Sequence, residues 1–234
     1  MEVFSKIAIA FTQGGAWMWV ILVMQIAAIA IIVERYVTLY LKRKTTEMNF
    51  ANEFESLIRK GELNEALAKA RQSQANHPLA YAIEAGIHSA LNLGGKEEIQ
   101  GKMDEVLLAE NSKLEQRTGF LPMLANVGTL TGLLGTIVGM IKSFAAVTYA
   151  NPMEKATLLS AGISEAMNTT AYGLIMAIPT LVLFAVLANR ATQLSEDLNQ
   201  GALKVFNWLS FAYEPVPARV ARTKNNPETP TVNA

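Results

Sequence analysis

The sequence contains no cysteine and only two histidines, His77 and His88, among its 234 residues. Without cysteine the chain can form no disulfide framework, no thiolate metal site and no cysteine nucleophile. Neither histidine has a partner at the spacing that a zinc site or an acyl-transfer triad needs. No carboxylate pair or phosphate-binding loop stands in a catalytic setting either. We therefore expect a protein that is not an enzyme and that uses no metal or cofactor.

Charged side chains are scarce as well. They make up 17% of the chain, whereas 51% of the residues are hydrophobic. An ordinary soluble domain carries roughly one quarter charged residues, so this balance favours a membrane protein. The formal net charge is zero, and no overall field would steer the chain towards nucleic acid.

Three segments, 17–37, 120–147 and 161–187, are apolar and long enough to cross a lipid bilayer. A bilayer core requires about 20 such residues in helical form. A cleaved signal peptide is the alternative interpretation of the first segment, and it would need a basic stretch before the apolar run. Lys6 is the only basic residue there. We therefore expect three retained transmembrane helices.

The orientation follows from the distribution of lysine and arginine. These residues are frequent between the first and second spans, beginning with Lys42, Arg43 and Lys44, and they recur after the third span. Between the second and third spans only Lys142 and Lys155 occur. Because basic loops tend to remain in the cytoplasm, we predict a multi-pass protein of the bacterial inner membrane with a periplasmic N-terminus and a cytoplasmic C-terminus.

The remaining segments have the pattern of cytoplasmic helices. Segment 38–119 has apolar residues at helical spacing, and segment 188–214 continues this pattern beyond the third span. Gly61 is expected to end one helix, and the helix before Gly119 is expected to continue into the membrane. Segment 215–234 is polar and contains several prolines, so it cannot bury a core and is predicted to be disordered.

Small residues mark the second and third spans as closely packed helices. GxxxG steps allow two helix backbones to approach each other, and a proline frees a backbone carbonyl and bends a helix. The predicted packing residues are Gly128, Gly132, Gly135, Gly139, Gly173 and Pro179.

Hydroxyl side chains lie near these small residues. Thr129 and Thr136 are seven residues apart on one face of the second span, and Thr169 and Thr170 belong to the third. Hydroxyls in membrane helices commonly bond to their own backbone carbonyls and do nothing else. Two consecutive spans with matching polar faces nevertheless favour a lined pathway for water or ions.

Neither span has an ionisable residue near its centre, because Lys142 and Glu165 both fall towards the outer ends. Proton movement through a bilayer normally requires a titratable group at depth. A proton pathway along these spans would therefore need a carboxylate from another chain.

Several strings resemble the MotA/TolQ/ExbB proton channel family. They are LLGTIVGM at 133–140, GISEAMNTTAYGL at 162–174 and AIP at 177–179, with QGG at 13–15 and VER at 33–35 upstream. The resemblance covers nearly the whole chain apart from the cytoplasmic domain and the tail. As a joint pattern over three spans it is specific.

The resemblance implies an all-α membrane protein with three transmembrane helices and long cytoplasmic helical extensions, assembled as a homopentamer. It also implies a single-span partner dimer of the ExbD/TolR type, which supplies the proton-carrying aspartate. Carried over by motif, Thr136 and Thr170 face that aspartate, and Glu165 matches the acidic position near the outer start of the third span.

Within this family, three spans and a moderate cytoplasmic loop look like the ExbB or TolQ branch, since MotA proteins have a fourth span and a larger cytoplasmic domain. We expect an ExbB-like subunit that powers TonB-dependent transport, with a TonB- or TolA-type protein as a further partner. A TolQ-like role in envelope maintenance and a passive membrane scaffold are the alternatives. The expected organisation is a periplasmic segment 1–16, spans 17–37, 120–147 and 161–187, a cytoplasmic domain 38–119, a periplasmic loop 148–160, a cytoplasmic helix 188–214 and a tail 215–234.

Overall fold

The computed structural model describes residues 15–42, 47–92 and 95–211, and all regular structure within them is helical. The elements are α2 (Gly15–Tyr36), a π-helical turn η1 (Val37–Lys42), α3 (Glu47–Lys60), α4 (Leu63–Ser73), α5 (Leu79–Leu91), α6 (Lys96–Glu115), α7 (Phe120–Tyr149) and α8 (Pro152–Phe211). The predicted all-α fold is thus confirmed for the described part of the chain. The predicted tail 215–234 and most of the predicted periplasmic segment 1–16 lie outside the described residues.

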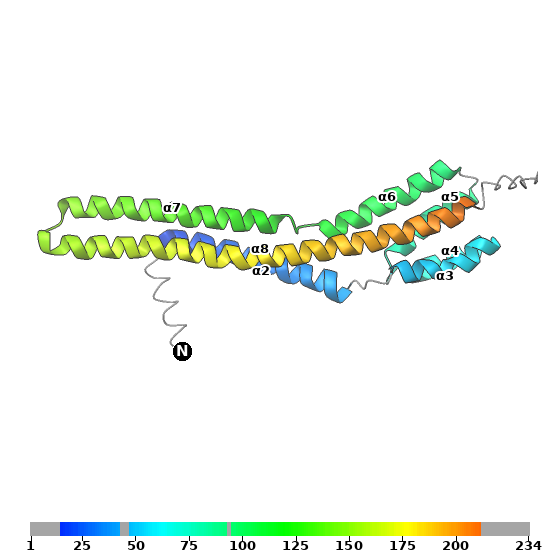
Figure 1. Cartoon of the computed structure of the whole chain (residues 1–234), viewed down its shortest axis with the longest axis horizontal. Helices are drawn as coiled ribbons and strands as arrows, with labels where there is room; N and C mark the ends of the chain where they lie inside the picture. Colours follow the sequence, from blue (N-terminus) through cyan, green and yellow to red (C-terminus); the bar gives the residue numbers. More distant parts are fainter. Residues whose placement is uncertain (1–14, 43–46, 93–94, 212–234) are drawn as a thin grey trace, which may run out of the picture.

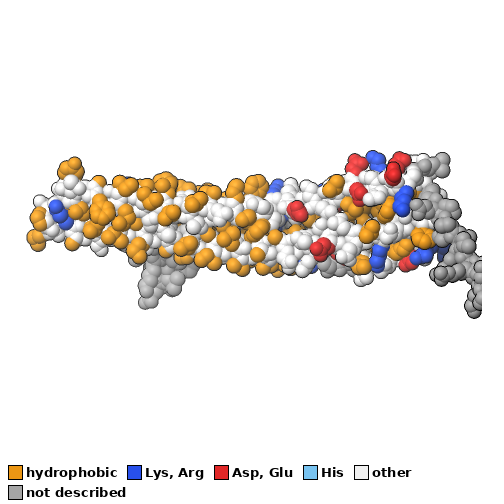
Figure 2. Space-filling model, turned by 45° about the horizontal axis from the view of Figure 1, so that its top comes forward, with side chains coloured by type: hydrophobic (Ala, Val, Ile, Leu, Met, Phe, Trp, Pro, Cys, Tyr) orange, Lys and Arg blue, Asp and Glu red, His pale blue; other side chains and the backbone are white. Residues whose placement is uncertain are grey.

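The molecule is elongated, with an arm and a head (Figure 1). Helices α2, α7 and α8 form the arm, and α3 to α6 surround the C-terminal part of α8 to form the head. Three helical segments are long and apolar enough to cross a membrane, as predicted. Figure 2 shows hydrophobic side chains spread over the surface of the arm, whereas acidic and basic side chains gather on the head. An apolar surface of this extent is suited to lipid or to other membrane helices.

Helix α8 runs for 60 residues from the tip of the arm to the end of the head. It continues without a break beyond the third predicted span, as the sequence indicates. The predicted loop 148–160 differs, because α7 extends to Tyr149 and α8 already begins at Pro152. The carbonyl of Asn151 accepts the first helical hydrogen bonds, from Glu154 and Lys155 at 2.9 and 3.2 Å. Proline fits the first position of a helix, where its missing N–H is not needed.

The chain breaks between α6 and α7, where the sequence predicts a continuous helix. The guanidinium of Arg35 donates to the carbonyls of Lys113 and Leu114, at 3.2 and 3.3 Å. In a continuous helix these carbonyls would accept N–H groups four residues further on. Arg117 has a φ of 63° and donates to the carboxylate of Glu34 at 2.7 Å. Two side chains at the end of α2 therefore hold the turn.

Helices α3 and α4 form a helical hairpin, and Gly61 follows the end of α3 as predicted. Gly61 has a φ of 80°, which glycine adopts with little cost. Its N–H donates to Ile58 at 3.1 Å, and the N–H of Glu62 donates to Leu57 at 2.9 Å. This pair of bonds satisfies two carbonyls at the end of α3 and is the Schellman motif of a glycine-terminated helix.

The head has a hydrophobic core to which α3, α4, α5, α6 and α8 all contribute. Its largest fully buried side chains are Phe54, Ile58, Leu79, Ile83, Ile87, Ile99 and Leu198. A second apolar cluster joins α2, η1, α6, α7 and α8 at the junction of arm and head. The two clusters fix the head to the arm, so that the spanning helices and the head form one continuous structure.

A buried carboxylate links three elements of the head. Glu47 is 6% exposed, and its Oε2 accepts the N–H of Leu79 at the start of α5 at 3.2 Å. Its own N–H donates to Asp197 of α8 at 3.0 Å, and its Oε1 lies 3.3 Å from Nδ1 of His77. Burial raises the pKa of Glu47, and the hydrogen bond from Leu79 and the nearby His77 oppose that rise. A carboxylate at a helix N-terminus is a favourable arrangement.

Candidate functional site

The two helices of the predicted pathway meet along their glycines. A Cβ on Gly132 would lie 3.2 Å from the Cα of Thr170 and 3.2 Å from the carbonyl oxygen of Thr169. A Cβ on Gly173 would lie 3.0 Å from the carbonyl oxygen of Gly128. Both neighbours are backbone atoms, which cannot move aside as a side chain can. The backbones of α7 and α8 are therefore in direct contact at this level.

The same face of α7 continues towards the tip of the arm. A Cβ on Gly139 would lie 3.1 Å from the Cβ of Ala166. Gly135 lies against the side chain of Thr169, and a Cβ there would also be 3.4 Å from the Cβ of Trp17 on α2. All four of the predicted α7 glycines are buried. An added Cβ at any of these four glycines would come too close to a neighbouring atom of the same chain.

Most threonine hydroxyls of the predicted site bond within their own helix. Thr129 donates to Ala125 at 3.0 Å, and Thr169 donates to Glu165 at 2.9 Å. Thr136 donates to the carbonyl of Leu133 at 2.5 Å and is half-buried. These bonds satisfy the hydroxyl hydrogens, while the hydroxyl oxygens keep lone pairs that can accept a hydrogen bond from water or from another chain.

Thr170 behaves differently from the other threonines. Its hydroxyl crosses to α7 and donates to the carbonyl of Gly132 at 2.9 Å. The glycine without a side chain is what lets the hydroxyl reach that carbonyl. Thr170 therefore joins the two helices, whereas Thr169, one residue earlier, points its hydroxyl back along α8.

Glu165 lies at the outer end of the helix pair. It is half-buried and lines a cavity of about 430 Å³ together with Lys142, Ser143 and Ser164. A Cβ on Gly15, the first residue of α2, would overlap the Glu165 carboxylate. The carboxylate thus lies beside the N-terminus of α2, where the positive end of the helix dipole favours an anion. Lys142 and Glu165 form no ion pair with any described residue, although they share the cavity.

Pro179 lies inside α8 and is exposed. The helix continues through it to Phe211. The next residue, Thr180, is buried and donates its hydroxyl hydrogen to the carbonyl of Met176 at 2.7 Å. Because proline has no backbone N–H, α8 lacks one helical hydrogen bond at this position. Pro179 lies on a side of α8 that faces away from the described helices.

One polar contact in the arm was not predicted. The hydroxyl of Tyr172 on α8 donates to Oε1 of Gln25 on α2. Gln25 is the only amide side chain in the apolar run 17–33. Its isolation among apolar residues was the feature of the sequence that could have indicated this contact. A glutamine side chain in a membrane helix usually finds a partner on a neighbouring helix. This contact ties α2 to the helix that carries Thr170.

Helices α7 and α8 carry no acidic or basic side chain between the outer end of the described arm and its junction with the head. In the ranges 120–147 and 161–187 the charged residues are Lys142 and Glu165 alone. Among the described residues there is also no group of histidine, aspartate and glutamate that could hold a metal ion. What the helix pair offers chemically is a set of hydroxyls and backbone carbonyls.

Comparison with known proteins identifies the family. A model of the MotA/TolQ/ExbB proton channel family matches residues 74–200. The chain belongs to this family. Within the MotA/TolQ/ExbB family it falls in the ExbB/TolQ-like branch, because its curated relatives carry those two names. It is therefore a membrane protein of a channel family and not of an enzyme family.

The relatives are distant and only partly covered. The Tol-Pal system protein TolQ of Haemophilus influenzae is 33% identical over 129 residues, which are 54% of this chain and 50% of that protein. The biopolymer transport protein ExbB of Pseudomonas putida is 27% identical over 48% of this chain and 34% of its own length. Its counterpart in Salmonella typhimurium is 26% identical over 59% and 56%, respectively. The chain spans about half the length of the curated relatives it matches.

The region matched by the MotA/TolQ/ExbB family contains the whole of α7 and the spanning part of α8. All eleven predicted site residues lie within it. Helix α2, with Gln25 and the Glu34–Arg35 pair, lies outside the match. The contacts of α2 with α7 and α8 are thus a finding of the structure alone.

Proposed function

We propose that the chain is the channel subunit of a proton-driven motor in the inner membrane. In this proposal α7 and α8 of five copies surround the transmembrane helices of a single-span partner dimer of the ExbD/TolR type. The N-terminus is periplasmic, the head is cytoplasmic, and proton flow produces movement that is transmitted to the periplasm.

The observation that carries the proposal is the polar composition of the α7–α8 pair. Half-buried Thr136 keeps acceptor capacity on its hydroxyl, and the described helices contain no carboxylate at the same depth. A proton pathway needs a titratable group there, so an aspartate on a partner helix is required. The hydroxyls would then position water around that aspartate.

The exposed surface of the arm supports an assembly of several copies. Leu130 and Ile141 on α7 are each 63% exposed, and Ile175 on α8 is 62% exposed. Further large apolar side chains on both helices are exposed on different sides. Lipid covers some of this surface, and neighbouring copies and the partner helices cover the rest.

The test is proton flux in proteoliposomes that contain the chain and its co-expressed single-span partner. Thr136→Val and Thr170→Val keep the side-chain shape but remove the hydroxyl. We expect the double variant to lose most of the flux and the Thr136→Ser variant to retain it. Thr131→Val is the matched control, because its hydroxyl makes the same kind of bond, to Val127 at 2.8 Å. It lies about 140° around the helix from Thr136, at 3.6 residues per turn. Wild-type flux in the double valine variant would refute the proposal.

For the task of the motor we propose TonB-dependent transport across the outer membrane, with a TolQ-like role as the alternative. The type of periplasmic domain on the partner gene product discriminates between the two tasks. Deletion of the gene should impair uptake through outer-membrane receptors in the first case and weaken the cell envelope in the second.

A passive scaffold is the second candidate function. The own-helix hydrogen bonds of Thr129, Thr136 and Thr169 favour it, since such bonds serve the helix alone. A scaffold would act equally well after the proton gradient has been collapsed. Full cellular activity in the presence of a protonophore would therefore select the scaffold over the motor.

A further inference from the structure

The cavity in the outer part of the arm lies between α7 and α8 and has a volume of about 430 Å³. Its charged side chains come from opposite sides, Lys142 from α7 and Glu165 from α8. Small residues from both helices leave it open: Gly139, Ala146, Ala161 and Gly162. Sites for small ligands usually measure about 300–1,000 Å³. The cavity is therefore large enough for a compact polar group.

The two charges in this cavity are opposite and unpaired. Lys142 and Glu165 form no ion pair with each other or with another described residue. Glu165 lies beside the N-terminus of α2, which supplies only about half an elementary charge. A half-buried charge without a full counter-charge is unfavourable. The pair is therefore complementary to a ligand that has both charges, with its anionic group at Lys142 and its cationic group at Glu165.

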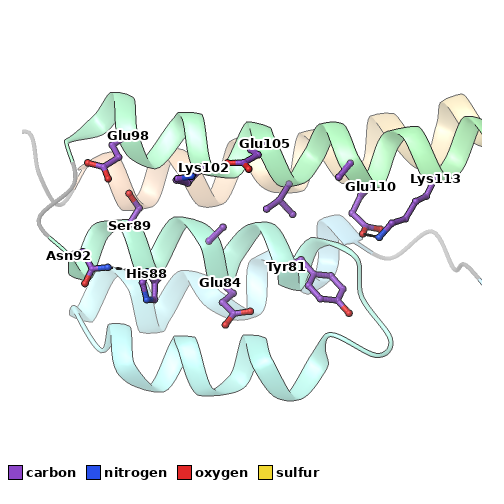
Figure 3. A pocket seen from close by; sticks show the side chains of 13 residues that line it. Tyr81, Glu84, His88, Ser89, Asn92, Glu98, Lys102, Glu105, Glu110 and Lys113 are labelled. Atoms are coloured by element: carbon purple, nitrogen blue, oxygen red, sulfur yellow. Dashed lines mark hydrogen bonds and ion pairs between the residues drawn. The ribbon is translucent and has the colours of Figure 1, made fainter.

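The groove between α5 and α6 in the head differs in this respect (Figure 3). It has a volume of about 730 Å³ and is also lined by charged side chains. Most of its carboxylates have a partner within the chain, and the pairs are Glu84 with Arg71, Glu105 with Lys102 and Glu110 with Lys113, at 2.7, 3.0 and 2.5 Å. The charges of the groove are thus largely balanced, whereas those of the outer cavity are not.

The position of α2 gives the depth of the outer cavity in a bilayer. The first predicted span, residues 17–37, is about 30 Å long at 1.5 Å per residue, which is the thickness of a hydrocarbon core. Trp17 then lies at one boundary of the core, and its Cβ is 3.4 Å from a Cβ added to Gly135 of α7. Helices α7 and α8 continue beyond the start of α2 towards the tip of the arm (Figure 1). Residues on this extension lie outside the hydrocarbon core.

Both charged residues of the cavity lie on this extension. Gly139 is about 6 Å further out than Gly135 along α7. A Cβ on Gly139 would lie 3.1 Å from the Cβ of Ala166, the residue next to Glu165. Lys142 is about 10 Å further out than Gly135 and on the same face of α7. The headgroup layer adds about 5–7 Å to each side of the core, and a lysine side chain is long enough to reach back into it. The cavity is therefore at the level of phospholipid headgroups.

We propose that this cavity binds the headgroup of phosphatidylethanolamine, a phospholipid with a phosphate and a primary ammonium group. The phosphate pairs with Lys142 and the ammonium group pairs with Glu165, so that each side chain gains a counter-charge. A primary ammonium group is preferred because its N–H groups donate to the carboxylate, whereas the trimethylammonium group of phosphatidylcholine has no N–H. Thr136 lies about 120° around α7 from Lys142, at 3.6 residues per turn. The site is thus separate from the predicted hydroxyl pathway, and its failure would leave the proposed function untouched.

Native mass spectrometry of the full-length protein in detergent measures the binding. Phosphatidylethanolamine, phosphatidylcholine and phosphatidylglycerol are added separately at equal concentrations. We expect the fraction of protein with bound phosphatidylethanolamine to be several-fold higher than with either other lipid, because phosphatidylglycerol lacks the cation and phosphatidylcholine lacks the donors. Equal binding of the three lipids would overturn the proposal.

Soluble phosphoethanolamine separates a free zwitterion from a lipid, since it has the same charged groups without acyl chains. We expect it to displace the lipid only at a concentration many-fold above that of the lipid. Displacement at a similar concentration would assign the cavity to a soluble ligand and overturn the proposal.

Two single substitutions remove the charges one at a time. Lys142→Gln and Glu165→Gln should each lower the binding of phosphatidylethanolamine several-fold. Lys155→Gln and Glu154→Gln are the matched controls, because both residues are exposed near the start of α8 and do not line the cavity. Equal losses in the controls, or unchanged binding after substitution of Lys142 and Glu165, would overturn the proposal.

A filled cavity tests the site without a change of charge, and it remains informative if Glu165→Gln harms folding. Ala146→Leu places a larger side chain in the cavity, whereas Ala145→Leu, at the neighbouring position, does not. Both alanines are exposed, so neither substitution overpacks a core. We expect several-fold weaker binding of phosphatidylethanolamine in Ala146→Leu and wild-type binding in Ala145→Leu. Equal binding in the two variants would refute the assignment of the lipid to this cavity.

Discussion

Thr170 on α8 donates its hydroxyl hydrogen to the carbonyl of Gly132 on α7, with 2.9 Å between the two oxygens. The bond connects the two helices at the level where their backbones touch. The same threonine is one of the two that the family resemblance assigns to the proton pathway. The observed interhelical bond and the proposed role in conduction thus fall on the same side chain, and experiments on Thr170 have to separate them.

Thr170→Val should weaken the α7–α8 contact by about 0.5–1 kcal/mol, the usual contribution of a hydrogen bond between membrane helices. Thr136→Val should cost less, because its hydroxyl bonds within α7. The apparent midpoint of thermal unfolding in detergent measures both effects. Thr170→Ser keeps the donor and should restore most of the loss. Equal midpoints for Thr170→Val and the wild type would show that the interhelical bond contributes nothing.

Gly132→Ala should destabilise the protein by about 1–3 kcal/mol, as overpacking against rigid neighbours does. The added Cβ would meet two backbone atoms of α8 at 3.2 Å. Gly101→Ala provides the matched control, since Gly101 lies within α6 and has no atom within 4 Å of an added Cβ. That variant should gain about 0.5–1 kcal/mol, because alanine favours the helix. The opposite signs can be read from unfolding midpoints, and a stabilising Gly132→Ala would contradict the close contact.

The elements that follow from local pattern were predictable from the sequence. The three apolar helices could be predicted because the length and the composition of each span are sufficient to identify them. Gly61 was also predictable as a helix end, since the left-handed backbone that follows α3 favours glycine. The early start of α8 had a local signal too, in Asn151 followed by Pro152, within the segment predicted to be a loop.

Features that depend on distant contacts were not predictable. The break after α6 depends on Arg35, which is 78 residues from Lys113 in the sequence. Nothing local indicates that Thr170 would cross to α7 while Thr169 would not. The partner of Gln25 is likewise 147 residues away. Sequence pattern identified the candidate residues, and only the packing of the helices assigned their contacts.

Arg117 tests the turn between α6 and α7. Its φ of 63° strains a residue with a side chain by about 1–2 kcal/mol. Its ion pair with Glu34 is exposed on both sides and contributes about 0–1 kcal/mol. Arg117→Ala loses the pair and keeps the strain, whereas Arg117→Gly loses the pair and relieves the strain. The glycine variant should therefore unfold at a higher temperature than the alanine variant. The reverse order would mean that the turn does not need a left-handed residue.

Glu47 should make the stability of the head depend on pH. Burial raises the pKa of Glu47 above its ordinary value of 4.5, so the folded protein binds a proton more tightly than the unfolded chain does. By linkage, stability must then fall as the pH rises from 4.5 through the raised pKa. Hydrogen bonds from Leu79 and from His77 limit this loss, while the nearby Asp197 adds to it.

Glu47→Gln removes the titration and keeps an oxygen that can accept the N–H of Leu79. The wild type should lose stability relative to this variant as the pH increases through the window above 4.5, and the difference should level off beyond it. Unfolding midpoints measured across the range provide the test. Glu65→Gln, at an exposed position on α4, controls for the loss of a surface carboxylate. If the wild type instead gained stability over the glutamine variant with rising pH, the charged form would be the favoured one, and His77 rather than burial would dominate at Glu47.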